Sequence, residues 1–134
     1  MKKRNIISFI LFLLYLVLVA WCCFGHFDNL PKVSRSILGI PTDKVVHFIM
    51  FFPFAFLCFA SFDYLAGKKW KALLLMAVVF IVGLIVATLT EAGQSLTSYR
   101  TADPLDFKAD AMALGVASLI ITVIILARKT KTNE

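Results

Sequence analysis

Charged residues are scarce in this chain and make up only 16% of its 134 residues. A soluble domain is ordinarily about a quarter charged and about half apolar, whereas 60% of this chain is hydrophobic and 13 residues are Phe. The mean hydropathy is +0.88. This composition excludes a soluble globular domain and predicts a membrane protein, and the length allows one small domain.

Cysteines and enzyme motifs are equally sparse. The three cysteines, Cys22, Cys23 and Cys58, form neither a CxxC metal motif nor a disulfide framework, and we interpret them as apolar filling of membrane helices. There is no Gly-rich phosphate loop, no nucleophile motif and no HExxH. We therefore expect no cofactor or resident metal. No RNA- or DNA-binding motif accompanies the net charge of +6, so we expect no nucleic-acid partner.

The chain instead contains four long apolar runs. A helix needs roughly 20 apolar residues to cross a bilayer of about 30 Å, and backbone polar groups inside lipid must be satisfied within the segment. The runs predict an all-α membrane protein, a bundle of four transmembrane helices that forms a single domain over residues 1–134. The expected helices cover about residues 6–24, 45–66, 72–94 and 107–127.

The first run also has the basic start of a signal peptide. Its apolar part is longer than the usual signal core, and Trp21 precedes Cys22 where a lipoprotein signal needs a small residue. We therefore favour a retained helix over a cleaved signal.

The basic residues predict an orientation. Nine of the fourteen Lys and Arg residues lie in three segments, with three in each: Lys2, Lys3 and Arg4; Lys68, Lys69 and Lys71; Arg128, Lys129 and Lys131. With an even number of membrane spans, these three segments lie on the same side of the membrane. The positive-inside rule makes that side cytoplasmic. We expect a multi-pass protein of the bacterial plasma membrane with both termini cytoplasmic, residues 25–44 and 95–108 outside, and anionic lipid as the partner of the basic segments.

Three polar stretches, residues 43–48, 91–94 and 99–110, abut the apolar runs and fall at the predicted outer face. In the first, Asp43 and His47 are four residues apart and share a helix face, so the carboxylate can orient the imidazole. Thr42 or Asp43 is expected to cap this helix, and Pro53 to bend it.

The other two stretches supply the remaining acids. Glu91 and Gln94 share a face near the end of the third run, and a carboxylate at this depth is expected to face the protein interior. Asp106 and Asp110 are four apart at the start of the fourth helix, where negative charge is favoured. Two rows of small residues should let this helix pack closely at the centre of the bundle: Ala109, Ala113 and Ala117, and Ala111 with Gly115.

At these residues the chain resembles the VanZ-like family of small bacterial membrane proteins. The family pattern is Asp-Lys-x-x-His-Phe opening one helix, Glu-x-x-Gln ending the next, an Arg-containing loop, and Asp-x-x-x-Asn-x-x-Gly. The matches span about residues 41–115: Asp43, Lys44, His47 and Phe48; Glu91 and Gln94; Arg100; Asp106. The chain departs from the pattern at Asp110 in place of Asn, Ala113 in place of Gly, and Phe51 in place of a frequent Tyr.

The name member of this family is linked to low-level resistance to teicoplanin, a lipid-tailed glycopeptide. The resemblance therefore implies a link to resistance, but it assigns no reaction to this chain. The expected ligand-binding residues are those of the polar stretches: Asp43, Lys44, His47, Glu91, Gln94, Arg100, Asp103, Asp106 and Asp110.

Three functions follow as hypotheses. In the first, the outward cluster binds a lipid headgroup, a lipid-linked envelope precursor or a glycopeptide, with Lys44 and Arg100 holding a phosphate or carboxylate. In the second, the polar residues clamp the helix ends of a structural or regulatory subunit. In the third, the protein is an enzyme with His47, Glu91 and Asp106 as catalytic candidates, through acid–base chemistry or a divalent metal. A homo-oligomer is compatible with each, because the small-residue rows also suit helix pairing between copies.

Overall fold

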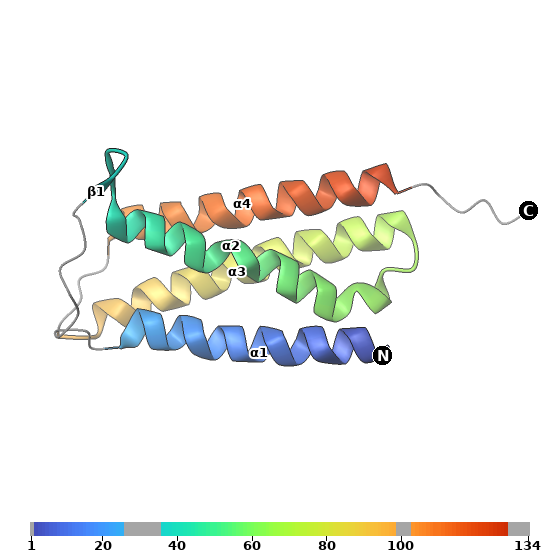
Figure 1. Cartoon of the computed structure of the whole chain (residues 1–134), viewed down its shortest axis with the longest axis horizontal. Helices are drawn as coiled ribbons and strands as arrows, with labels where there is room; N and C mark the ends of the chain where they lie inside the picture. Colours follow the sequence, from blue (N-terminus) through green and yellow to red (C-terminus); the bar gives the residue numbers. More distant parts are fainter. Residues whose placement is uncertain (1, 26–35, 99–102, 129–134) are drawn as a thin grey trace, which may run out of the picture.

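The computed structural model describes residues 2–25, 36–98 and 103–128. Four long helices run alternately up and down and form an antiparallel bundle (Figure 1): α1 (Lys3–Phe24), α2 (Thr42–Phe62), α3 (Lys69–Ser95) and α4 (Pro104–Ala127). A short 3₁₀ helix, η1 (Asp63–Leu65), follows α2 directly. All four helices are long and apolar enough to cross a membrane, which confirms the predicted all-helical architecture with four candidate spans.

Each helix begins three residues before the predicted position, at residues 3, 42, 69 and 104 instead of 6, 45, 72 and 107. The reason is that the first turns contain polar or charged residues, so the apolar pattern begins only after the helix has started. The predicted cap of α2 is wrong: Pro41 precedes the helix and Thr42 is its first residue, with no side-chain cap. The side-chain cap lies on α4, where the Asp103 carboxylate accepts the Leu105 N–H at 2.9 Å.

A small hairpin leads into α2. Strand β1 (Ser36–Ile37) pairs antiparallel with β2 (Ile40–Pro41). The turn residues Leu38 and Gly39 have φ of +52° and +81°, the conformation of a tight hairpin turn of primed type. No hairpin was predicted here, because only Gly39 in the turn is a usual turn residue.

The core lies where α2 meets the other helices. Helices α2 and α3 each contact the three other long helices, and the contacts of α2 are the more extensive, whereas α4 packs mainly against α2 and α3. Helix α2, and not α4, is therefore the central helix. Pro53 lies inside α2, as predicted. In the first predicted row, Ala113 and Ala117 of α4 are fully buried. In the second row, Gly115 faces open space, so that row does not form a tight contact at this position.

The two ends of the bundle differ in charge. The end of α1, the start of α2, the end of α3 and the start of α4 meet at one end, as Figure 1 shows. This end, which we call the acidic end, contains Asp43, Glu91, Asp103, Asp106 and Asp110, while the opposite end contains the described residues Lys2, Lys3, Arg4, Lys68, Lys69, Lys71 and Arg128. The helix arrangement therefore gathers the three predicted polar stretches, as far as they are described, at a single end.

Candidate functional site

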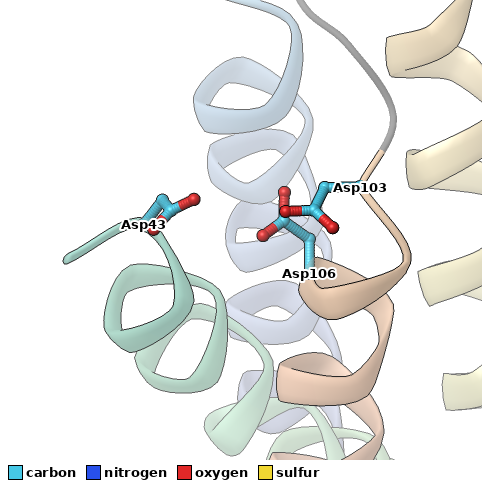
Figure 2. Close-up of side chains that lie close together, drawn as sticks. All are labelled: Asp43, Asp103 and Asp106. Carbon is cyan, nitrogen blue, oxygen red and sulfur yellow. The ribbon is translucent and has the colours of Figure 1, made fainter. Parts of the chain in front are cut away.

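A lysine lies among three carboxylates at the acidic end. The Lys44 ammonium donates to Asp43 at 2.9 Å and also to Asp103 and Asp106. Figure 2 shows Asp43 at the start of α2 facing Asp103 and Asp106 at the start of α4. Residues about sixty positions apart in the chain thus join the first turns of two helices, and we call this group the Lys44 nest.

The nest uses the whole hydrogen-bonding capacity of Lys44. An ammonium group has three donors, and each is directed at a different carboxylate. The Lys44 ammonium, with the Leu105 N–H, holds the pKa of the Asp103 carboxyl below its usual value. Lys44 therefore has no donor left for a phosphate or carboxylate ligand, and the geometry does not favour the anion-binding role expected of it.

The imidazole of His47 lies between Asp106 of the nest and one further carboxylate, that of Asp110. Its Nδ1 is 3.0 Å from Oδ1 of Asp110, and its Nε2 is 3.6 Å from Oδ2 of Asp106. His47 is 5% exposed and Asp110 is completely buried. The second oxygen of Asp110 has no hydrogen-bond partner among the described residues. Asp110 thus orients the ring and leaves Nε2 as the nitrogen directed toward the nest, the arrangement by which a carboxylate fixes a histidine tautomer.

Gln94 and Glu91 have separate roles. The Gln94 side chain is 2% exposed and donates to the Cys23 carbonyl at 3.1 Å, which ties the end of α3 to the end of α1. One Glu91 oxygen accepts the Asp103 backbone N–H, and the other is buried with no partner among the described residues. This burial agrees with the predicted inward orientation of Glu91. The polar contacts of His47 within the described chain are with Asp110 and Asp106, so its pairing with Glu91 as an acid–base couple is not supported.

A cavity of about 460 Å³ opens among these groups. It lies between the end of α1, the start of α2, the end of α3 and the start of α4. Its polar lining comes from the nest carboxylates and from Thr42, His47 and Gln94, and the rest of its wall is apolar or contains sulfur. The lining residues are Cys22, Cys23, Thr42, Asp43, Val46, His47, Met50, Gln94, Asp103 and Asp106. The volume lies within the usual range for small-molecule sites, about 300–1,000 Å³.

The structure brings together most of the predicted site residues. The nest is joined to the His47–Asp110 pair by the 3.6 Å contact between His47 and Asp106. The connected group thus contains Asp43, Lys44, His47, Asp103, Asp106 and Asp110, and Glu91 is joined to it through the backbone of Asp103. Arg100 lies outside the described residues. The cavity walls formed by Val46 and Met50 were not predicted, although positions 43, 46, 47 and 50 follow the i, i+3, i+4, i+7 spacing of one helix face. No sequence pattern indicated that Cys22 and Cys23 line the cavity, because their position depends on how α1 packs against the other helices.

Three carboxylates of the nest also meet the distance criterion for a cation site. Ligand oxygens of Asp43, Asp103 and Asp106 lie within 4.8 Å of one another. The Lys44 ammonium donates to all three, so it occupies the position between these oxygens that a metal ion would take. A metal would have to displace Lys44, and the arrangement therefore fits a lysine-bridged acidic cluster better than an open metal site.

Comparisons of the chain with known protein families, with curated proteins and with solved structures found no match. The fold and the site define a class: a small bundle of four candidate membrane-spanning helices with an acid-lined cavity at one end.

Proposed function

We propose that this protein is a VanZ-like, multi-pass protein of the bacterial plasma membrane that binds the polar head of an amphiphile at the outer membrane surface. The observation that carries the proposal is the cavity at the acidic end, which combines carboxylates, an imidazole and an amide with an apolar wall. Such a lining suits a molecule with a polar head and an apolar body, because most small-molecule sites are concave, largely apolar and carry a few placed polar groups.

The distribution of basic residues supports the orientation. The end opposite the cavity carries Lys2, Lys3, Arg4, Lys68, Lys69, Lys71 and Arg128, and positive residues are retained on the cytoplasmic side of membrane proteins. In this orientation both termini are cytoplasmic and the cavity faces outward. The site would then meet lipid headgroups, lipid-linked envelope precursors and antibiotics that act outside the cell.

The resemblance to the VanZ-like family supports the choice of ligand class. The family motifs supply Asp43, Lys44, His47, Gln94 and Asp106, and these residues either line the cavity or bind residues that do. Teicoplanin, which has a polar peptide core and a lipid tail, is a ligand of this kind. Resistance to it is implied by the resemblance alone.

The second candidate is a structural clamp. The Lys44 nest joins α2 to α4, and Gln94 joins α3 to α1, so the same residues hold the helix ends together. A clamp explains the hydrogen bonds but gives no reason for a cavity of about 460 Å³ beside them. The cavity is an open recess at the helix ends whose lining joins charged groups to an apolar wall, and this combination favours the binding function.

An enzyme is the third candidate, and one feature favours it. The buried carboxylate of Asp110 orients His47, and the far nitrogen of the ring lies near Asp106 at the cavity. A histidine held in this way can transfer a proton to or from a bound molecule. Binding requires fewer assumptions than catalysis, because it needs no reactive group beyond the polar lining of the cavity.

Binding is tested with purified protein in detergent, a bacterial polar lipid extract and teicoplanin as probes, and native mass spectrometry as the readout. We expect saturable binding of one amphiphile class by the wild type and a loss of at least about tenfold in affinity for Asp106→Asn, which neutralises a cavity carboxylate, equivalent to about 1.4 kcal/mol. Lys108→Gln is the matched control because Lys108 is an exposed residue of the same helix end and does not line the cavity.

Thermal unfolding of the same variants separates the candidates. A binding site predicts that Asp106→Asn remains folded while affinity falls. A clamp predicts that unfolding temperature falls and that no amphiphile binds the wild type selectively. Selective binding that Asp106→Asn leaves unchanged would contradict the cavity as the binding site.

A further inference from the structure

We propose that the cavity recognises its ligand through a primary ammonium group carried by a lipid headgroup. The inference rests on the proposed binding function and specifies the chemistry of the ligand. Three independent features of the cavity lead to it: its charge, the free nitrogen of His47, and its size relative to a metal ion.

The charge of the cavity favours a cationic group. Asp43, Asp103 and Asp106 contribute three carboxylates, and among the described residues Lys44 is the one ammonium bonded to them. If all four groups are ionised, two negative charges remain at the cavity. A carboxylate accepts several hydrogen bonds, so each nest carboxylate retains acceptor capacity after it has bonded Lys44. The nest is itself a demonstration that a primary ammonium fits between the starts of α2 and α4.

His47 adds a polar contact directed into the cavity. The side chain is 6% exposed and lines the cavity. Its Nδ1 is engaged by Asp110, while Nε2 has no hydrogen bond within the described part of the chain, its nearest carboxylate oxygen being 3.6 Å away on Asp106. In the neutral tautomer that donates from Nδ1 to Asp110, Nε2 is an acceptor. In that tautomer Nε2 can accept a hydrogen bond from a molecule in the cavity, and an ammonium group carries three donors.

The size and the wall of the cavity suit an organic headgroup better than a bare metal ion. A water molecule takes about 30 Å³, and a cavity of about 460 Å³ has room for many such volumes. Val46 and Met50 line one side, and neither offers the hard oxygen ligands that a divalent cation of the Mg²⁺ type requires. An organic headgroup can place its ammonium at the carboxylates and His47 while its carbon atoms contact this wall.

A lipid is the source that the position of the cavity favours. It lies at the ends of helices whose outer surfaces are apolar and long enough to cross a membrane, so an ammonium held at the level of the headgroups can enter while its acyl chains stay beside the bundle. A soluble amine would gain the same polar contacts without the apolar ones.

The test varies the ligand and keeps the protein unchanged. Wild-type protein in nanodiscs of phosphatidylglycerol is titrated with four lipids of identical acyl chains: phosphatidylethanolamine, its monomethyl and dimethyl derivatives, and phosphatidylcholine. We expect affinity to fall along this series by at least about tenfold in total, because each methyl group removes a donor while the charge is retained. Glycerophosphoethanolamine, which has the same headgroup without acyl chains, is expected to bind at least about tenfold more weakly than the lipid.

Each outcome decides one question. Equal affinity for all four lipids, or a preference for phosphatidylcholine, overturns recognition through ammonium donors but leaves headgroup binding intact. Preference for phosphatidylglycerol overturns the cationic class. Equal binding of glycerophosphoethanolamine overturns the lipid as source. If none of these lipids binds and the wild type also binds no component of a total lipid extract and no teicoplanin, the proposed binding function fails together with the inference.

His47→Gln and Asp106→Asn locate the effect. Both are expected to reduce the difference between phosphatidylethanolamine and phosphatidylcholine, while Lys108→Gln retains it. If both cavity variants fold, as judged by thermal unfolding, and both retain the wild-type difference, the ammonium site lies elsewhere and the assignment to this cavity is overturned. If either fails to fold, the lipid series with the wild type still decides the proposal.

Discussion

The Nδ1 nitrogen of His47 lies 3.0 Å from an oxygen of Asp110, a residue with no exposed surface at all. The two residues come from α2 and α4 and are 63 positions apart in the chain. In the proposed resemblance to the VanZ-like pattern, Asp110 takes the place of an Asn. Both side chains offer an oxygen that accepts the Nδ1–H, so the contact explains how either residue can occupy this position.

We therefore expect Asp110→Asn to remain close to the wild type in stability and Asp110→Ala to be destabilised. The alanine variant leaves a buried imidazole N–H without an acceptor, which costs about 1–3 kcal/mol. Thermal or denaturant unfolding in detergent measures the difference. Ser118→Ala on the same helix is the control, because the Ser118 hydroxyl is buried with no partner in the described part of the protein and its removal breaks no bond. Equal stability of the two Asp110 variants would show that the hydrogen bond is not what holds His47.

Acid should weaken the Lys44 nest through Asp103. The Lys44 ammonium lowers the pKa of the Asp103 carboxyl from its ordinary value of 3.8. A carboxyl with a lowered pKa in the folded state stabilises the fold above its ordinary pKa, and this contribution is lost as the pH falls through the folded-state value. We expect wild-type stability to decline below about pH 4, an estimate that follows the usual carboxyl range, and Asp103→Asn to flatten part of that decline. An identical acid profile for the variant contradicts the role of Asp103.

At the end opposite the acidic end, two side chains bind the same carboxylate and allow a matched comparison. Asn5 is fully buried and donates to Asp63 and to the Ala60 carbonyl at 2.9 Å, whereas Arg4, whose side chain is 70% exposed, pairs with Asp63 at 2.6 Å. We expect Asn5→Ala to cost about 1–3 kcal/mol through unsatisfied buried groups, and Arg4→Ala less than about 1 kcal/mol, as for exposed ion pairs. Unfolding experiments on the two variants check the order, and a larger loss for Arg4→Ala contradicts it.

The number and approximate positions of the helices were predictable because a long apolar run has few alternatives in a membrane. The grouping of Asp43, His47, Asp106 and Asp110 at one end followed from alternating helix directions. The partners within that group did not follow. Whether His47 meets Glu91 or Asp110 depends on the rotation of α3 and α4 about their axes, and uniformly apolar helices such as residues 72–89 carry little pattern that fixes rotation.

The cavity and the central position of α2 could not be predicted from the sequence, for a related reason. Small-residue rows suggested that α4 is central, but a row shows only that close approach is possible. At Gly83 the close approach is realised: a Cβ there would lie 2.7 Å from a Leu114 methyl group and 3.2 Å from the Phe54 ring. At Gly115 it is not, because nothing lies within 4 Å of such an atom.

This contrast gives a packing prediction. Gly83→Ala should destabilise the bundle by about 1–3 kcal/mol, the usual cost of overpacking a core, because both Leu114 and Phe54 are buried and have little room to move. Gly115→Ala, the control on α4, should be neutral or stabilising by up to about 1 kcal/mol, since Ala is the better helix former. Thermal unfolding of both variants provides the measurement. Equal effects would mean that α3 does not approach α4 and α2 at Gly83.

The orientation of the protein in the membrane can be tested through its cysteines. Cys22 is partly exposed near the acidic end, whereas Cys23 and Cys58 are buried. A membrane-impermeant thiol reagent added to intact cells should therefore label a variant that retains Cys22 alone, and should leave one that retains Cys58 alone unlabelled before and after permeabilisation. A C-terminal reporter that is active only in the cytoplasm provides an independent test. It should be active, because the proposed topology places that terminus inside. If Cys22 is labelled only after permeabilisation and the reporter is inactive, the orientation is the reverse of the proposed one. The cavity would then face the cytoplasm and would meet inner-leaflet lipids in place of envelope precursors.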